Sequence, residues 1–315
     1  MKLILKLLTK ILFRALIAVL ALAVLTVGVL NVAKFVLYHE YYSIKTNVCK
    51  NPGLNDGFLC QGIAASEENE LILVSGYMKD GSASRIYAVD SFDNFHYVSL
   101  KQLDSDFTGH AGGVAVTDGK VYIASGGKIY TVSLDEVATA ESGAVIDVGE
   151  GVEVNNEASF VYTDDTYLYV GEFHNGKQYN IVGHENETAE GTHYAICSVY
   201  DPADLSKPVK VYSIRNKVQG ICFTPDGKVV MSTSYGLADS VYYVYNLSEA
   251  TDSGKTLDGA PLFYLDHLEG EIKGPAMSEG LDYRDGKVIT LTESASQKYI
   301  FGKLFGANYI VGLEF

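Results

Sequence analysis

One pattern returns five times after residue 60 and governs what this chain of 315 residues can fold into. Each copy consists of a small residue, a short apolar strand, a turn and a second apolar strand. The clearest copies begin at Gly113, Gly220 and Gly280, and weaker ones begin at Gly62 and Ser159. Asp-Gly occupies three of the five turns, which suits a tight hairpin between antiparallel strands. The sequence therefore predicts five successive hairpins.

The spacing of the copies indicates a ring or a stack of similar units. Successive copies are 51, 46, 61 and 60 residues apart, and such periods are typical of propellers and solenoids. Two more apolar strands follow each of the first four hairpins, at 85–90, 96–100, 128–134, 144–148, 193–201, 208–214, 240–247 and 261–265. Four antiparallel strands form the blade of a β-propeller. We therefore expect an all-β propeller of five four-stranded blades, with six blades as the alternative.

The fifth unit is one strand short, because the chain ends with that unit's third strand. We expect the segment around Tyr41–Thr46 to supply the fourth strand and close the ring. Closure is favoured physically, because it removes exposed strand edges. A polar insert at His174–Thr192 separates the second and third strands of blade three. Its length and composition predict a surface loop, and long surface loops often carry function.

The N-terminal residues predict a membrane anchor. Lys2, Lys6, Lys10 and Arg14 precede an uncharged, apolar run at Ala15–Ala33. Such a run, at about 1.5 Å per residue, nearly matches a hydrocarbon layer of roughly 30 Å. Basic residues before the run favour an N-terminus inside and a body outside. The alternative is a cleaved signal peptide, but the run is long for one and no clear Ala-x-Ala site follows it.

The chain is expected to have four parts, with the propeller strongly acidic. These are a basic cytoplasmic N-terminus at 1–14, a single-pass transmembrane anchor at 15–37, a linker with the ring-closing strand at 38–60, and an extracytoplasmic propeller at 61–315. Of 24 basic and 39 acidic residues, six basic and one acidic precede residue 49, which leaves a net charge of −20 on the rest. This charge argues against nucleic-acid binding. It favours solubility, or a cationic or divalent-metal partner.

Four cysteines fall into two groups. Cys49 and Cys60 flank a turn region, and in an extracytoplasmic body a disulfide between them is expected. Cys197 and Cys222 lie inside apolar strand patterns, so we interpret them as small buried hydrophobic residues.

The repeat also predicts where a site lies. Connections into first strands and connections between second and third strands emerge on one face of a propeller, which we call the mouth face. Residues just before or at the start of first strands are Gln61, His110, Asn155, Asn156, Glu157, Gln219 and Glu279. Residues that end or follow second strands are Tyr77, Glu172, His174, Tyr235 and Glu293. Carboxylates, imidazoles and amides are therefore expected to gather around one mouth of the central channel.

Three interpretations of this cluster remain open. In the first, the polar groups cap strand ends and bind channel water, as in any propeller. In the second, Ca²⁺ is held by Glu157, Glu279 and amide oxygens such as that of Asn156, because hard cations take six to eight oxygen ligands. In the third, Glu279, Glu293 or His110 performs acid–base catalysis in a partly desolvated mouth. The residues expected to contact a bound ligand are Gln61, Asn156, Gln219, Glu172, His174 and Tyr235.

Three histidines lie in or beside the insert. His174, His184 and His193 have spacings of ten and nine residues, which fit no compact zinc motif. We therefore interpret them as unrelated loop residues.

The strand opened by Gly and turned by Asp-Gly-Lys resembles a diverse propeller superfamily. This group includes the YVTN and YncE-type repeats and the gluconolactonase, strictosidine-synthase and paraoxonase-like proteins. The resemblance covers about residues 60–315 and rests on general features of blades. The calcium-dependent hydrolases of that group carry acidic and amide ligands at the inner ends of first strands, where this chain has Glu279, Asn156 and Glu157. The chain departs from them in having five units instead of six.

The sequence thus favours a membrane-anchored, extracytoplasmic five-bladed propeller that binds a small ligand or a protein partner on its mouth face. The first alternative is a calcium-dependent hydrolase of the lactonase or esterase type that uses the same face. The second is a scaffold subunit of a cell-envelope complex.

Overall fold

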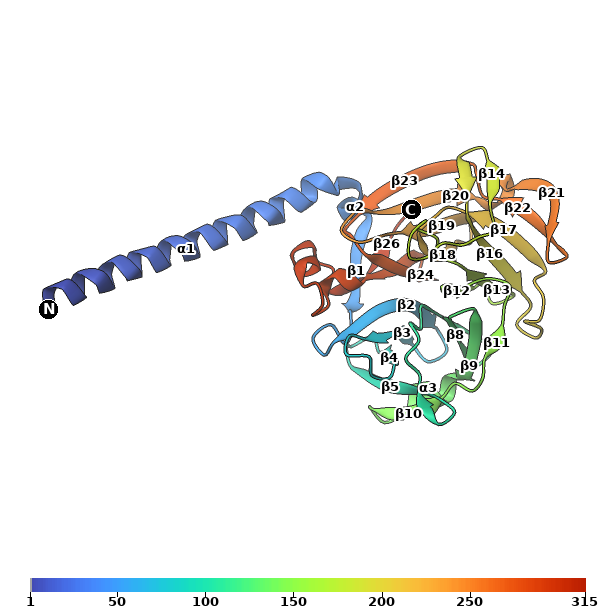
Figure 1. The fold of residues 1–315 in the computed structure, drawn as a ribbon, viewed down its shortest axis with the longest axis horizontal. Coiled ribbons are helices and arrows are strands. Elements are labelled where there is room, and N and C mark those ends of the chain that lie inside the picture. The colour runs from blue at the N-terminus through green and yellow to red at the C-terminus, as the bar shows by residue number, and fades with distance from the viewer. Residues whose placement is uncertain (1) are drawn as a thin grey trace.

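Apart from one short two-stranded hairpin, the strands after residue 44 form a ring of five sheets, from which one long helix projects (Figure 1). The computed structural model describes residues 2–315. The innermost strands of the sheets contact one another in a closed circle. They are β2 (Phe58–Ser66), β7 (Gly113–Thr117), β12 (Phe160–Thr163), β18 (Val218–Phe223) and β24 (Ser278–Arg284). The fold is a five-bladed β-propeller.

Each blade continues outward from its innermost strand. Blade one adds β3 (Leu71–Met78), β4 (Arg85–Val89), β5 (Phe95–Gln102) and the short β6 (Ser105–Asp106). Blade two adds β8 (Lys120–Ser125), β9 (Lys128–Ser133) and β11 (Val152–Glu153). Blade three adds β13 (Leu168–Gly171), β16 (Ala195–Tyr200) and β17 (Lys210–Ile214). Blade four adds β19 (Lys228–Thr233), β20 (Ser240–Asn246) and β23 (Leu268–Gly274), and blade five adds β25 (Lys287–Thr292), β26 (Tyr309–Leu313) and β1 (Lys45–Lys50).

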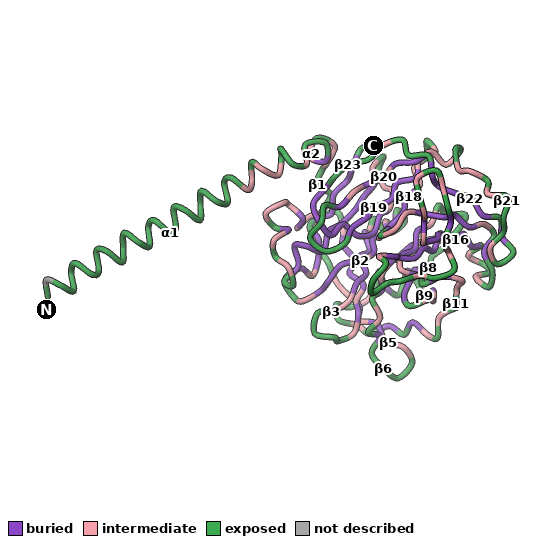
Figure 2. Tube along the Cα trace, turned by 45° about the horizontal axis from the view of Figure 1, so that its top comes forward, coloured by how far each residue is buried: buried purple, intermediate pink, exposed green. Residues whose placement is uncertain are grey.

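Helices are confined to the N-terminus and to connections. They are α1 (Lys2–Leu37), α2 (His39–Ile44) and α3 (Leu134–Thr139), with the 3₁₀ turns η1 (Leu247–Glu249), η2 (Glu293–Ala295) and η3 (Phe301–Phe305). One α-helix among the described residues, α1, is long and apolar enough to span a membrane, over Ile4–Leu37. No residue of that span is fully buried, and Figure 2 colours α1 as exposed except near its C-terminal end, where some residues are half-buried.

The ring closes as expected, but with a later segment. β1 at Lys45–Lys50 pairs antiparallel with β26, so the N-terminal strand completes the last blade. Most of the predicted segment, Tyr41–Ile44, belongs instead to α2. Tyr41 is buried and stacks on Tyr242 of blade four, with 6.1 Å between the ring centroids. Because this aromatic contact anchors the chain beside blade four, the strand begins only where the chain reaches blade five.

Two predicted fourth strands belong to the preceding blade. β10 (Ala144–Asp147) pairs in parallel with β5 of blade one, and β22 (Ala260–Tyr264) pairs in parallel with β17 of blade three. β21 (Thr251–Leu257) then extends the blade-three sheet beyond β22. These additions cover strand edges that otherwise offer unpaired backbone groups. The true fourth strands, β11 and β23, are polar and largely exposed, so their sequences lack the apolar pattern that identified the others.

Glycines begin the repeats because the ring leaves no room at its axis. A Cβ atom at Gly113 would lie 2.3 Å from the backbone nitrogen of Val161 in the next blade, and one at Gly62 would lie 2.5 Å from that of Val114. Gly280 would place its Cβ 3.0 Å from backbone atoms of blade one. Alanine at the first two positions forces the blades apart, and overpacking of this kind costs about 1–3 kcal/mol.

The cysteines are all free and buried. Cys197 and Cys222 are fully buried in the core, as expected. The disulfide expected between Cys49 and Cys60 is not formed. Cys49 lies in β1, the outermost strand of blade five, and Cys60 lies in β2, the innermost strand of blade one. The Cys60 thiol instead accepts a hydrogen bond from Nδ2 of Asn51, at 3.2 Å.

Candidate functional site

Two groups of polar side chains lie where second strands end on the mouth face. One group surrounds Glu293, which directly follows β25 of blade five, and the other surrounds Glu172, which directly follows β13 of blade three. Both glutamates are therefore at corresponding positions of the repeat. Both glutamates are buried. The sequence pattern alone does not predict this burial.

Glu279 and Glu293 form a buried acid pair in blade five. Glu279 lies in β24, and the pairing of Ser278 with Thr292 brings it beside the start of η2. The backbone N–H of Glu293 donates to the carbonyl of Met277, at 3.1 Å, and holds the turn in place. The residues retain 3% and 9% of their surface exposure.

Burial sets the protonation of this acid pair. Loss of solvent raises the pKa of Glu279 well above its usual range, and the nearby charge of Glu293 raises it further. Loss of solvent also raises the pKa of Glu293 to about 7, and the cation of Lys298 and hydrogen bonds from neighbouring side chains oppose the rise. Near neutral pH the pair therefore holds at least one proton, which is the state required of a general acid.

Further side chains connect the acid pair to blades one and two. Gln61 Nε2 donates to Oε2 of Glu293 at 3.3 Å. Lys298 Nζ donates to the hydroxyl of Tyr77 at 3.2 Å, and the ring of Tyr77 stacks on His110, with centroids 4.6 Å apart. Burial lowers the pKa of His110, and the charge of Lys298 adds to this effect. The predicted catalytic residues are thus linked through Tyr77 and Lys298.

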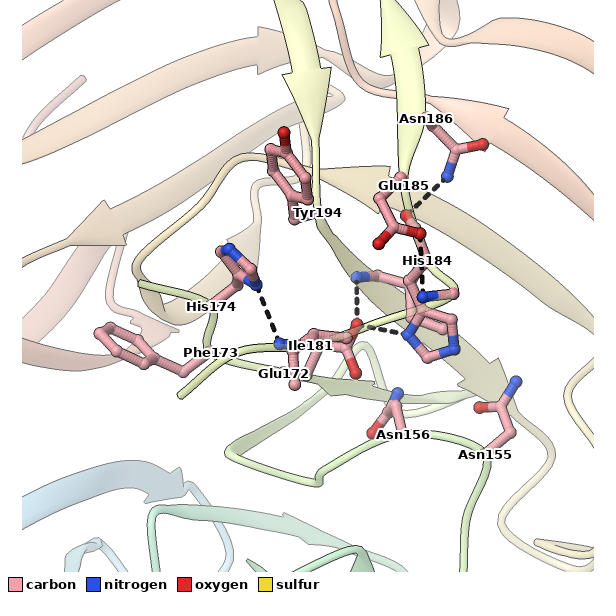
Figure 3. Close-up of polar contacts among 12 residues, drawn as sticks. Asn155, Asn156, Glu172, Phe173, His174, Ile181, His184, Glu185, Asn186 and Tyr194 are labelled. Atoms are coloured by element: carbon pink, nitrogen blue, oxygen red, sulfur yellow. Dashed lines mark hydrogen bonds and ion pairs between the residues drawn. The ribbon is translucent and has the colours of Figure 1, made fainter. Parts of the chain in front are cut away.

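Glu172 has one satisfied and one unsatisfied oxygen. It is fully buried. Its Oε1 accepts hydrogen bonds from Nδ1 of His184, at 2.6 Å, and from the backbone N–H of Ile196, at 3.0 Å (Figure 3). Its Oε2 has no hydrogen-bond partner among residues 2–315. The hydrogen bond to Glu172 raises the pKa of His184, because the carboxylate favours the imidazolium form.

The insert folds over this carboxylate in two sections. Residues 175–185, which we call the flap, are held by a hydrogen bond from the backbone N–H of Ile181 to Nδ1 of His174, at 3.0 Å. The His174 ring stacks on Tyr194, with centroids 4.8 Å apart. The hairpin of β14 (Asn186–Thr188) and β15 (Gly191–His193) is fixed further out, where Glu190 pairs with Arg215 at 2.5 Å.

A cavity of about 520 Å³ lies between the flap and the connection from blade two to blade three. We call it the blade-three cavity. It is lined by Gly126, Gly127, Lys128, Glu153, Val154, Asn155, Asn156, Glu157, Glu172, Asn180, Ile181, Val182 and His184. A second cavity of about 400 Å³ lies beside His174, across flap residues 180–182. Three carboxylates, against one lysine and the imidazole of His184, make the blade-three cavity attractive to cations.

The remaining predicted ligand residues are spread around the mouth. Asn156 lines the blade-three cavity, but its amide already caps the strand: Oδ1 accepts from the N–H of Ala158 and Nδ2 donates to the carbonyl of Val170. Gln219 bonds to Ser234 at 3.3 Å. Tyr235 is exposed on the surface.

The predicted calcium ligands do not come together as one set. Glu157 and Asn156 line the blade-three cavity, whereas Glu279 lies in blade five. Within residues 2–315, no three His, Cys, Asp or Glu side chains are grouped so as to hold a metal ion. Calcium binding by Glu157, Glu279 and Asn156 stays a prediction.

Sequence reasoning missed two partners of the buried glutamates. His184 was interpreted as an isolated loop residue, yet it pairs with Glu172 from twelve residues away. Lys298 lies in the connection between β25 and β26, which corresponds to the connection that carries the insert in blade three. Both belong to irregular segments, whose folding no periodic pattern predicts.

Comparison with known proteins extends to fold alone. No family model matches the chain, and no curated protein matches it. Several solved structures of propeller proteins do match it. An aldose sugar dehydrogenase from Streptomyces coelicolor is 16% identical over 79% of this chain and 77% of its own, with a TM-score of 0.45. A gluconolactonase from Xanthomonas campestris is 13% identical over 82% and 76%, with a TM-score of 0.37. BamB from Moraxella catarrhalis is 10% identical over 81% and 83%, with a TM-score of 0.33.

Proposed function

We propose that this protein is a membrane-anchored, extracytoplasmic β-propeller that binds a small cationic ligand in the blade-three cavity. Anchoring is supported by the apolar span of α1 and by the basic residues Lys2, Lys6, Lys10 and Arg14 near its start. Basic residues stay on the cytoplasmic side, so the propeller lies on the other.

The observation that carries ligand binding is the unpartnered Oε2 of Glu172. A buried carboxylate oxygen without a donor is costly, because it has given up water and gained nothing in return. Glu172 borders the cavity, but its side chain is fully buried, so a ligand donor reaches Oε2 only once the flap residues that cover it move aside. An ammonium group suits this position best, since Glu153 and Glu157 add negative charge and Lys128 is the cavity's one basic side chain besides His184.

Thermal unfolding of the full chain in detergent tests this proposal. The probes are putrescine as an organic dication, CaCl₂ as a metal ion and glucose as a neutral polyol. A ligand at 100 times its dissociation constant stabilises the native state by about 2.7 kcal/mol. We expect putrescine to raise the melting temperature of the parent and not that of Glu172→Gln. Glu67→Gln, on an exposed turn of blade one, is the matched control and should behave like the parent.

Each probe gives a distinct result. A rise in melting temperature with CaCl₂ alone would show that the ligand at these carboxylates is a metal ion and not an organic cation. An equal shift with glucose would show that charge does not select the ligand. No shift with any probe, or a shift that survives in Glu172→Gln, contradicts the proposal.

A second candidate function is hydrolysis by the acid pair. The specific observation is the buried pair Glu279 and Glu293, one of whose members remains protonated near neutral pH. Such a pair supplies a general acid beside a general base. Hydrolysis of p-nitrophenyl acetate and γ-butyrolactone, with and without CaCl₂, tests it. Activity that falls in both Glu279→Gln and Glu293→Gln supports the hydrolase, and an inactive parent rules out esters and lactones of this type.

A further inference from the structure

The end of α1 is packed against one loop of the propeller. The uncharged run of α1 ends at Lys34, whose Nζ donates to Oδ1 of Asn31 at 2.9 Å and to the carbonyl of Leu304 at 3.4 Å. Leu304 belongs to η3, within the connection between β25 and β26. We call residues 297–308 the η3 loop. Because Lys34 marks the polar boundary of the apolar run, the η3 loop lies at the level of that boundary.

Aromatic contacts fix the same junction. The hydroxyl of Tyr42 donates to the carbonyl of Phe305 at 2.5 Å, and the ring of Tyr38 lies edge-on to that of Phe305. The hydroxyl of Tyr38 also donates to Asp239 of blade four, at 2.8 Å. The η3 loop therefore flanks the chain on both sides of Leu37, where α1 ends.

The η3 loop has the composition of a membrane-interface segment. Ile300 is 62% exposed and has φ of 55°, a backbone conformation that β-branched residues rarely adopt. Tyr299 and Phe301 flank it, and Lys298 and Lys303 lie nearby in the loop. Aromatic and lysine side chains around an exposed apolar residue are typical of segments at the boundary between lipid and water. Water alone gives no reason to present Ile300 in a strained conformation.

We propose that the η3 loop is a second membrane contact, with Ile300 inserted into the outer interface of the bilayer that α1 spans. The occupant of this surface is phospholipid. The inference rests on the membrane anchoring of the proposed function. It goes beyond it by fixing how the propeller is held: α1 alone attaches the body to the membrane at one place, whereas a second contact also sets its orientation. Since Lys298 of the same loop bonds to Tyr77, the acid pair then lies close to the lipid surface.

The chain has no tryptophan, so a single introduced tryptophan reports its own surroundings. Three full-length variants are reconstituted into phosphatidylcholine vesicles, which add no tryptophan, with and without brominated acyl chains that quench tryptophan. Ile300→Trp probes the η3 loop. Leu22→Trp probes the middle of α1. Phe92→Trp is the matched solvent control, because Phe92 is 82% exposed on the turn between β4 and β5 of blade one.

The inference predicts that brominated lipid quenches Leu22→Trp and Ile300→Trp and leaves Phe92→Trp unchanged, with a blue-shifted emission at position 300. Quenching at position 22 without quenching at 300 overturns the second contact and leaves the anchor intact. No quenching at position 22 overturns the anchor and the inference together. If Ile300→Trp fails to fold, Lys303→Trp reports from the same loop by the same criteria.

Discussion

Glu172 and Glu293 stand at the same place in two copies of one repeat, and the chain treats them in opposite ways. Glu172 receives a protonatable partner, because the insert brings His184 to its Oε1. Glu293 receives a second carboxyl, Glu279, and an amide from Gln61. The repeat therefore buries a glutamate in both blades, but the partner differs: the insert supplies an imidazole in blade three, and the inner strand β24 supplies a second carboxyl in blade five.

Neutralising Glu293 should have the largest effect on stability. Its pKa rises from 4.5 to about 7 on folding, so the folded state holds this proton more tightly than the unfolded chain. The stabilisation is complete below pH 4.5 and is lost as the pH rises through about 7. Glu293→Gln cannot lose a proton, so we expect it to raise the free energy of unfolding at pH 8 by about 2–3 kcal/mol.

Urea unfolding at pH 5 and pH 8 measures this effect. The gain should be present at pH 8 and small at pH 5, where Glu293 is already protonated in the folded state. Glu67→Gln serves as the exposed control and should change neither value. A destabilised Glu293→Gln at pH 8 would show that the acid pair is held as anions.

The corresponding substitution in blade three, Glu172→Gln, should instead lower the free energy of unfolding. Glu172→Gln removes the anion that faces His184, and a hydrogen bond between charged groups contributes about 1.5–3 kcal/mol. We expect the free energy of unfolding at pH 7 to fall by about 2 kcal/mol. His184→Asn should lose a similar amount, and the double variant should lose little more than either single variant. Additive losses in this cycle would mean that the two residues act independently.

Removing Lys298 should change the pH at which Glu293 loses its proton. Its cation lowers the pKa of Glu293, so Lys298→Met should move the loss of stability to a higher pH. Because Lys298 is largely exposed, solvent screening limits the change in unfolding free energy to less than about 1 kcal/mol. Lys303→Met, in the same loop but bonded to Asn55, is the control. An unchanged pH profile in Lys298→Met would show that this lysine does not affect the pKa of Glu293.

The smallest expected effect concerns the flap. Burial lowers the pKa of His174, so the folded state favours the neutral ring that accepts the Ile181 N–H. This contribution is present above pH 6.5 and is lost as the pH falls through the lowered value. We expect the Ile181 amide to lose hydrogen-exchange protection at acidic pH, once intrinsic rates are corrected, by about 0.5–1 kcal/mol. Equal loss across the β14–β15 hairpin would indicate opening of the whole insert.

The fold followed from the sequence because its repeat is enforced by packing. The neighbouring backbone requires glycine at Gly62, Gly113 and Gly280. The sequence shows this requirement as a glycine that recurs at the start of the repeat. The apolar alternation located every inner strand. It assigned β10 and β22 to the wrong blades, because an apolar strand does not encode which edge it joins.

The site was predicted only as a set of positions. The sequence named Glu172, Glu279 and Glu293 from their places in the repeat, and the structure buries all three. It did not predict that the hydrogen bond to Glu172 raises the pKa of His184, or that Lys298 opposes the raised pKa of Glu293. The partners come from the long connections between the second and third strands of blades three and five. Their contacts are tertiary, and local sequence carries no periodic trace of them.

The central claim is that Glu172, and not its counterpart in blade five, holds a cation. Isothermal titration of putrescine into the parent, Glu172→Gln and Glu293→Gln at pH 7.5 tests it most directly. The account predicts binding to the parent and to Glu293→Gln with similar affinity, and loss of binding in Glu172→Gln. Binding that persists in Glu172→Gln, or that disappears only in Glu293→Gln, would contradict it.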